Sequence, residues 1–529
     1  MKNNIFKTIV VSAFLSVSLS SCDDALDIVQ DGELNNENTI LNTDDMNKYL
    51  NGALYASLDA TSPIFFSAQL TDELGMGPQN SELALSPHQY YVDRTNGTVA
   101  SIWLGNYSII NRVNRLLESS QKVTPLNAAD QIKYNNILAQ ARLIRAYSYF
   151  TLLSYFSTDM KNPNALGVML LDNVPELTDS RPRVNNSVIF AAIDADITFA
   201  NTNLAISNGD YFRIGSNFLN AFKARYYLYR GMYPQAKIAA QAVLTNSGLT
   251  LTVASPPNPG VLAQKNAAHV ALNAYTSTNP YVKMLNDTSR GEVVFGLNRP
   301  FVGAWGNIGS LFASNTSTAS GGISYDMGRK IFNLYGAVPG DIRYYAYVDP
   351  TSLISATYST IATYRAADVL VIDKYPGRPQ LAADGTVSGQ APLRNDLKIF
   401  RLSEMYFILA ECAVEEASYS TAATLIKSVR DARNFSAPVA LPSYSSKQQA
   451  YADILLERRK ELYLEGHRYL DLKRLGATAG VAIDRDPTDD LKTIPVTIPI
   501  DDYRMKSLPI PLAEIQGNPA IVDQQNPGY

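Results

Sequence analysis

Cysteine and histidine are scarce in this chain of 529 residues, which has two cysteines and three histidines. Cys22 and Cys412 cannot make a disulfide framework, and Cys412 is expected to be a small core residue. His88, His269 and His467 lie far apart and show no metal-ligand spacing, so a zinc site is not expected. The sequence therefore predicts neither a metal nor a cofactor.

Basic runs and long apolar runs are also missing. The formal net charge is −4 and the isoelectric point is about 5.6, with no basic stripe. These values exclude nucleic acid and an anionic membrane surface as the main partner and favour a neutral ligand. After the N-terminus, no segment is apolar for long enough to span a bilayer. The hydrophobic content of 46% is sufficient for a large core.

Residues 1–21 have the pattern of a secretory signal peptide. Lys2 and Lys7 precede an apolar stretch at 9–19, which suits a signal but is too short for a membrane span. Leu19-Ser20-Ser21-Cys22 resembles a lipobox, after which Cys22 would carry the acyl chains that anchor the protein to a membrane. An ordinary secretory signal that ends in a chance cysteine is the alternative.

Residues 22–40 are predicted to form a flexible tether, because they are polar, acidic and rich in asparagine. The acidic start at Asp23, Asp24 and Asp27 resembles the surface-export signal of Bacteroidetes lipoproteins. The expected location is therefore the outer membrane, with the protein lipid-anchored and facing the cell exterior.

From residue 41 to 529 we expect a single domain that is mainly α-helical. Apolar residues recur at three- and four-residue spacing from Asp44, beginning with Met46 and Leu50, and Thr43 can cap this helix. The same periodicity predicts further helices at 98–120, 128–157, 186–206, 216–230 and 233–246.

Two segments resemble tetratricopeptide helix hairpins, in which small residues let two antiparallel helices approach closely. They are Gly231-Met232-Tyr233-Pro234-Gln235-Ala236 and Ala417-Ser418-Tyr419-Ser420-Thr421-Ala422. They lie too far apart in the sequence to predict one continuous array, but they indicate stacked helix pairs.

Proline, glycine and serine mark two regions with little regular structure. The first is a loop-rich insert at about 250–395, with a strand-like piece at 292–297, where a rigid helical scaffold would carry the binding surface. The second begins at about 480 and contains seven prolines up to Pro527. This tail is expected to wrap the surface without forming a helix.

Four segments are similar to motifs of the SusD/RagB family. They are the helix at 141–156, the helix at 401–411 with the stretch at 426–433 after it, the charged segment 457–474, and the tail from Leu508-Pro509-Ile510-Pro511 to Gln525-Asn526-Pro527-Gly528-Tyr529. Lys427 replaces a usual asparagine, and Phe156-Ser157 replaces an aromatic-glycine pair. Order and spacing agree over essentially the whole mature chain.

This resemblance implies a SusD-like fold, in which tetratricopeptide-like helix pairs form a scaffold for a loop-rich ligand-facing region with few short strands. It also implies a surface lipoprotein, not an enzyme, that captures oligosaccharide or polysaccharide. The expected partner is a SusC-like TonB-dependent outer-membrane transporter, over which the protein sits as a lid. The alternative is a RagB-like lid that binds peptides.

The charged segment allows a second interpretation. Glu457, Glu461 and Glu465 share one helix face, as a catalytic carboxylate pair would require. However, Arg458 and Lys460 are interleaved with them, which is typical of a helix with ion pairs at three-residue spacing. The predicted pairs are Glu457 with Lys460, Arg458 with Glu461, Glu465 with Arg468, and Asp471 with Arg474.

A glycan site needs flat aromatic platforms and short polar groups around them. The two tryptophans, two adjacent tyrosines and the polar residues near them are the candidates for ligand binding, namely Trp305, Trp103, Tyr90, Tyr91, Asp72, Arg94 and Asn307. A surface glycosidase and a helical-repeat adhesin are the other function classes. No nucleophile elbow, phosphate loop or dinucleotide fingerprint supports an enzyme.

Overall fold

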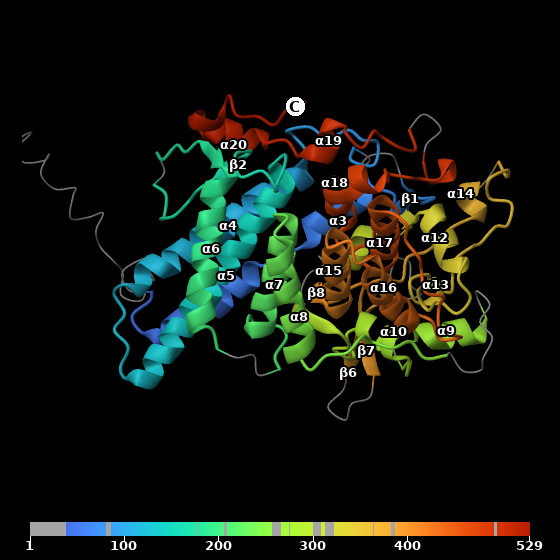
Figure 1. Cartoon of the computed structure of the whole chain (residues 1–529), viewed down its shortest axis with the longest axis horizontal. Helices are drawn as coiled ribbons and strands as arrows, with labels where there is room; N and C mark the ends of the chain where they lie inside the picture. Colours follow the sequence, from blue (N-terminus) through green and yellow to red (C-terminus); the bar gives the residue numbers. More distant parts are fainter. Residues whose placement is uncertain are drawn as a thin grey trace, which may run out of the picture.

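The computed structural model describes residues 39–80, 86–176, 178–205, 209–256, 266–274, 276–299, 308–312, 322–362, 364–381, 387–490 and 495–529. Within these ranges the chain is mainly α-helical with a few short strands, as the sequence predicts. Figure 1 shows the helices of the first half on one side, those of the C-terminal half on the other, and the C-terminal tail along the top.

The first half is built from helices close to the predicted ranges. They are α2 (Thr43–Tyr49), which continues through a π turn at Leu50–Leu54 and a 3-10 turn at Tyr55–Ser57, then α3 (Thr61–Leu70), α4 (Gly97–Ser120), α5 (Ala128–Phe156), α6 (Asn186–Asn203), α7 (Ser216–Tyr229) and α8 (Tyr233–Asn246). Asn127 caps α5 by accepting a hydrogen bond from Asp130 N. Asn42, rather than the predicted Thr43, caps α2.

Both predicted helix hairpins form. The first pairs α7 with α8, and the second pairs α15 (Leu402–Glu415) with α16 (Tyr419–Arg433). The turns use left-handed backbone at Gly231 and Ala417, with φ of 73° and 55°. Helix α15 also packs against α8, so the two hairpins stack despite their separation in the sequence.

The remaining helices follow in the middle and at the end of the chain. They are α9 (Ala267–Asn273), α10 (Pro280–Leu285), α11 (Ile308–Phe312), α12 (Arg329–Gly336), α13 (Arg343–Ala346), α14 (Tyr364–Ala367), α17 (Lys447–Glu461), α18 (Arg468–Ala479), α19 (Tyr503–Lys506) and α20 (Leu512–Gly517). In the described residues of the loop-rich insert, each helix has eight residues or fewer.

The strands of the described chain form four antiparallel pairs. These are β1 (Leu74–Met76) with β5 (Tyr325–Met327), β2 (Leu166–Met169) with β3 (Arg183–Asn185), β4 (Val293–Leu297) with β8 (Leu397–Arg401), and β6 (Gly377–Leu381) with β7 (Val387–Pro392). The strand-like piece predicted at 292–297 corresponds to β4. The others are too short, or interrupted too often, to show an alternating pattern.

The C-terminal tail differs from its prediction. It contains the short helices α19 and α20, although prolines delimit both of them. Leu508, Ile510 and Ile521 are fully buried, so the tail contributes to the core as well as covering it.

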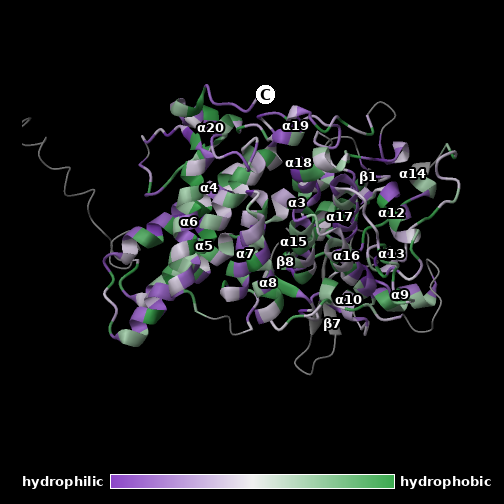
Figure 2. Ribbon diagram, viewed as in Figure 1, coloured by the Kyte–Doolittle hydropathy of each residue, from purple (hydrophilic) through white to green (hydrophobic). Residues whose placement is uncertain are grey.

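Buried apolar side chains join the two halves into one continuous cluster from Ile40 to Ile521. A smaller cluster fills the space between α15, α16 and α17. Figure 2 shows hydrophobic and hydrophilic residues alternating along the helices of the first half, as amphipathic packing requires. Among the described residues, no helix combines the length and apolar character needed to cross a membrane.

The charged segment 457–474 is buried, and its ion pairs differ from the predicted ones. Glu457 contacts Arg343 and Arg430, and Glu465 contacts Arg401, all on other elements. Further cross-element contacts include Arg458 with Asp471, Lys460 with Asp341, and Arg468 with Asp72. Of the predicted pairs, Asp471 with Arg474 is confirmed at 3.1 Å.

The same contacts bear on the catalytic interpretation of the three glutamates. Each carboxylate is buried and held by at least one arginine. A glycosidase needs carboxyl groups that are free to reach the sugar. Glu457, Glu461 and Glu465 are therefore framework residues.

Candidate functional site

The loop with Tyr90 and Tyr91, which the sequence marks as ligand-facing, follows β1, and β1 pairs with β5. Beyond the strands, Gly77 N donates to Ser324 O at 3.0 Å, and Gln79 N donates to Ile323 O at 3.1 Å. We call residues 77–80, 86–96 and 322–324 the rim. Trp305 and Asn307 lie outside the described residues, as does Cys22.

The rim rests on a buried charged base. Arg485 donates to the carbonyl oxygens of Gln69, Leu70 and Thr71 at 3.0, 3.0 and 2.8 Å. These carbonyls lie at the C-terminal end of α3, where a helix leaves its acceptors unsatisfied. Arg485 also donates to His88 O at 2.5 Å, so one side chain fixes the rim to α3.

His88 completes this base. Its Nε2 lies 2.5 Å from Asp490 Oδ1, and Asp490 also lies 3.3 Å from Arg485 Nη1. Burial and the nearby Arg485 lower the pKa of His88. The contact with Asp490 acts in the opposite direction, but burial is the larger effect.

Tyr90 belongs to the base and not to the ligand-facing surface. It is 3% exposed, has φ of 60°, and packs its ring over the Arg485 guanidinium at 4.4 Å. Burial raises the pKa of its hydroxyl above the usual value. The prediction that Tyr90 contacts ligand is corrected, because its ring has no open face.

Tyr91 and Arg94 are the predicted site residues that the structure places in solvent. Tyr91 is 64% exposed, and Arg94 is also exposed. The backbone beneath them is fixed, because Arg94 O accepts a hydrogen bond from Leu512 N at 2.8 Å. The rim therefore presents an aromatic ring and a guanidinium on an ordered support, a combination suited to sugars.

Trp103 is a core residue, which corrects its prediction as a platform. It is fully buried in α4 and packs against Tyr107 and Phe156, with ring centroids 5.0 and 4.7 Å away. Its Nε1 donates to Glu514 Oε2 at 2.9 Å and so ties α4 to α20. No face of the indole is open to a ligand.

Asp72 is likewise a structural residue. It is 2% exposed and accepts two hydrogen bonds from Arg468, both at 2.8 Å, while Arg459 lies 3.5 Å away. Burial alone would raise the pKa of Asp72, but the two guanidinium groups outweigh it and hold the pKa well below its usual range. Asp72 joins the end of α3 to α17 and α18, and this corrects its assignment to the ligand site.

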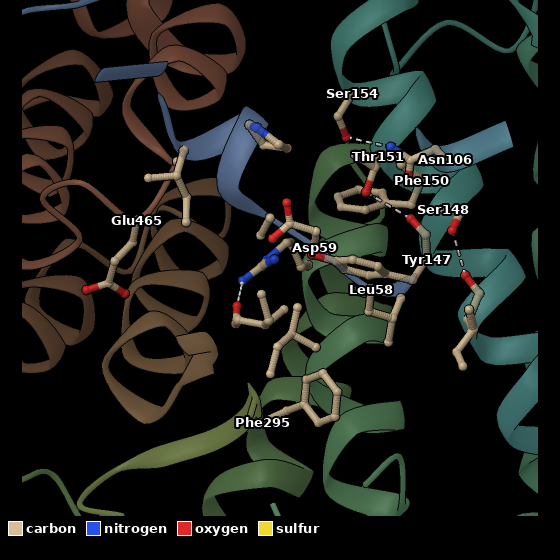
Figure 3. A pocket seen from close by; sticks show the side chains of 18 of the residues that line it. Leu58, Asp59, Asn106, Tyr147, Ser148, Phe150, Thr151, Ser154, Phe295 and Glu465 are labelled. Atoms are coloured by element: carbon tan, nitrogen blue, oxygen red, sulfur yellow. Dashed lines mark hydrogen bonds between the residues drawn. The ribbon is translucent and has the colours of Figure 1, made fainter. Parts of the chain in front are cut away.

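An interior cleft separates the α4, α5 and α7 layer from the C-terminal half. It encloses about 940 Å³, including the part open to solvent. Figure 3 shows Asp59, Tyr147, Thr151 and Glu465 among the side chains that line it. Asp59 pairs with Arg299 at 2.7 Å, and Glu465 pairs with Arg401 and Lys374.

The hydroxyls along the cleft are also occupied. Ser148, Thr151 and Ser154 each donate to the carbonyl oxygen four residues earlier on α5. The cleft therefore offers mainly apolar surface and few free polar groups. We interpret it as a packing seam between the two halves, and the rim is the better candidate site.

Arg485 and Asp490 are the site residues that the sequence did not single out. The sequence gives little indication of their role, because Arg485 and Asp490 are two charged residues in a proline-containing tail that is predicted to wrap the surface. His88 lies close to Tyr90 and Tyr91 in the sequence, but its partner Asp490 lies about 400 residues later in the chain. Among the described residues, no group of three or more His, Cys, Asp or Glu side chains is arranged to hold a metal ion.

Known proteins share the motifs and length of this chain. Residues 343–529 match the model of the SusD family. SusD-like protein P2 of Formosa agariphila is 24% identical over 540 aligned residues, which cover 97% of this chain and 98% of that protein. SusD-like protein P25 of the same organism is 32% identical over 139 residues, which cover 25% of this chain and 24% of that protein.

Solved structures share the fold. A SusD superfamily protein from Bacteroides thetaiotaomicron aligns with a TM-score of 0.71 and 22% identity, covering 92% of this chain and all of that one. A SusD-like carbohydrate binding protein from Bacteroides vulgatus aligns with a TM-score of 0.64 and 17% identity, covering 91% and 98%. A laminarin binding SusD-like protein aligns at 0.61 and 22%, covering 93% and 100%. Residues 343–529 are therefore similar to the SusD family, and the chain shares its fold with SusD superfamily structures over more than 90% of its length.

Proposed function

We propose that this chain is a glycan-binding surface lipoprotein that captures oligosaccharide or polysaccharide and has no catalytic activity. The observation that carries the proposal is the full-length likeness to SusD-like proteins, two of which are described as carbohydrate binding and laminarin binding. The rim adds a physical reason, because exposed Tyr91 and Arg94 lie on a buried, paired base.

Capture alone does not move a glycan across a membrane. In the proposed function the captured glycan passes to a SusC-like TonB-dependent transporter, over which the protein acts as a lid. Binding above a pore raises the local ligand concentration there. Co-purification of the tagged protein with a large outer-membrane barrel tests this partnership. If detergent extracts retain the lipoprotein but no barrel protein co-purifies with it, the partnership is contradicted.

The proposed anchor is the acylated Cys22 after removal of residues 1–21. Replacement by Cys22→Ala should move the protein from the outer-membrane fraction to the soluble fraction, because the acyl chains supply the membrane affinity. Metabolic labelling with an alkyne fatty acid should mark the wild type only. Equal labelling of both forms would contradict the anchor.

The ligand is tested by affinity gel electrophoresis of the protein that begins after Cys22, with one polysaccharide in each gel. Retardation that is reduced in both Trp305→Ala and Tyr91→Ala supports glycan capture at the rim loops. Ile238→Ala, which trims a side chain 72% exposed on α8, is the matched surface control and should migrate as wild type.

Three other outcomes have definite meanings. No retardation by any polysaccharide would favour the peptide-binding alternative, to be tested with a peptide library on the same protein. Release of shorter sugars during incubation would contradict a purely binding role. Retardation that survives both rim variants would place the glycan site elsewhere on the chain.

A further inference from the structure

A second pocket lies between α12, α16 and α17, and none of its lining residues belongs to the rim. Its walls are aliphatic, formed by Leu334, Val338, Val439 and Leu456. It encloses about 610 Å³, including the part open to solvent. The wall side chains are half-exposed, whereas the floor is charged and buried.

The carboxylates on the floor are already satisfied. Asp341 Oδ1 accepts from Arg343 N and Nε, and Asp341 Oδ2 accepts from Arg343 Nη2 at 2.8 Å. Glu457 Oε1 accepts from Arg343 Nη1 at 2.8 Å, and its Oε2 accepts from Arg430 Nε at 2.7 Å. These groups have little capacity left for a donor on a ligand.

Two floor cations keep unused donors. Lys460 Nζ lies 2.9 Å from Asp341 Oδ2, and its side chain is 7% exposed, yet an ammonium group has three donors. Arg430 uses Nε for Glu457 and Nη2 for Asp453. Within the described chain, its Nη1 has no hydrogen-bond acceptor. The groups on the floor that remain available for hydrogen bonds to a ligand are therefore donors.

The numbers of positive and negative side chains at the floor indicate how a ligand would be bound. Lys460, Arg343 and Arg430 face Asp341 and Glu457, and Asp453 brings the charges to equal numbers. A net positive field is therefore absent. An acceptor would be bound by directed hydrogen bonds, which are strongest when the acceptor is ionised.

The side chains of the pocket walls indicate which kind of ligand body would carry this acceptor group. Asn434 is a polar residue at the mouth, but its Nδ2 donates to Pro339 O, and its Oδ1 accepts from Ser436 N and Ala437 N. Ligand hydroxyls against these walls would lose water without gaining partners, which is unfavourable. An aliphatic body fits the walls better than a sugar ring does.

We propose that this pocket binds a small aliphatic carboxylate, with the carboxylate on Lys460 and Arg430 and the hydrocarbon against Leu334, Val338 and Val439. Hexanoate is the probe, and saturation-transfer NMR on the protein that begins after Cys22 is the measurement. Hexanol, which has the same body without the charge, should bind at least ten-fold more weakly, because it loses the charge-assisted hydrogen bonds. Glucuronate should also bind more weakly than hexanoate.

Two variants test the location. Lys460→Met keeps the aliphatic stem and removes the donor, and it should weaken hexanoate binding at least ten-fold. Because Lys460 also pairs with buried Asp341, Val439→Trp is the second variant. It fills the mouth without changing any charge and should also abolish saturation transfer. Lys447→Met, on the same helix and 46% exposed, should bind as wild type.

Each contrary result is informative. Absence of saturation transfer from hexanoate overturns the proposal, as does wild-type binding by both Lys460→Met and Val439→Trp. Equal affinity for hexanol would mean that the floor does not select a carboxylate. Tighter binding of glucuronate would assign the pocket to an acidic sugar instead. None of these outcomes depends on glycan capture at the rim.

Discussion

Replacing Glu461 by glutamine should strongly destabilise the C-terminal framework, because this carboxylate joins three arginines. It is fully buried at the end of α17. The donors are Arg343 Nη1 at 3.1 Å, Arg401 Nη1 at 2.6 Å and Arg433 Nε and Nη2 at 3.0 and 2.9 Å. Burial would raise the pKa of Glu461, but these guanidinium groups hold it well below its usual range.

The expected loss of unfolding free energy follows from burial. Glutamine keeps the shape of the side chain but removes the one negative charge that faces all three arginines. Breaking a buried ion pair from one side costs about 3–5 kcal/mol. That is a large part of the roughly 5–15 kcal/mol that stabilises a typical folded protein.

Glu416→Gln is the matched control. Glu416 contacts Lys237 at 2.8 Å, but the two side chains are 45% and 50% exposed. An exposed pair contributes about 0–1 kcal/mol. Urea unfolding followed by circular dichroism should therefore give a much lower midpoint for Glu461→Gln than for Glu416→Gln. Equal shifts for both variants would refute the reasoning.

The pH dependence gives an independent check on Glu461. A carboxyl group whose folded pKa is depressed stabilises the fold above its unfolded value of 4.5, and this stability is lost as the pH falls through the folded pKa. Wild-type protein should lose stability below pH 4.5 more steeply than Glu461→Gln. Parallel profiles would mean that Glu461 is not ionised in the fold.

Three further predictions concern Glu73, Trp103 and Tyr91. Burial raises the pKa of Glu73 from 4.5 to about 7, so stability should fall by about 3 kcal/mol as the pH rises through this window. Glu73→Gln should remove that fall, as measured by urea midpoints at either end of the window. Trp103→Phe loses the hydrogen bond to Glu514 and should destabilise by about 1.5–3 kcal/mol, with unchanged retardation by glycan gels. Tyr91→Ala should reduce retardation while changing stability by less than about 0.5 kcal/mol, because its ring is exposed.

The helical scaffold could be predicted because its signals are local. Apolar spacing placed α4, α5 and α8 within a residue or two of their observed ends. Small residues such as Ala236 and Ala240 allowed α7 and α8 to approach closely. The contact between α8 and α15 was not predicted, because no local pattern shows which helices meet across a long separation in the sequence.

The short strands could not be predicted for a physical reason. Three residues, as in β1 and β5, are too few to show alternation. They form because β1 follows directly from α3 and lies beside β5, with Asp72 and Arg485 fixing the end of that helix. This pairing brings the residues that follow β1 and those that precede β5 side by side.

The polar residues were the hardest to assign, because sequence does not show whether a charge is buried. Asp72 and Tyr90 have the chemistry of a sugar site, yet both are covered by arginine. Glu457 and Glu465 have the spacing of a surface ion-pair helix, yet their partners come from other elements. Spacing along one helix records only neighbours on that helix.

This distinction explains why the family is easier to assign than the ligand. The segments 401–411 and 457–474 carry the resemblance, and their charges are buried in pairs, where losing one partner costs several kcal/mol. Tyr91 and Arg94 are exposed, where most substitutions change stability little. Rim residues can therefore vary with the ligand while the framework stays the same. Ligand specificity must then be measured on the rim loops, because the framework that defines the family does not contact the ligand in the proposed function.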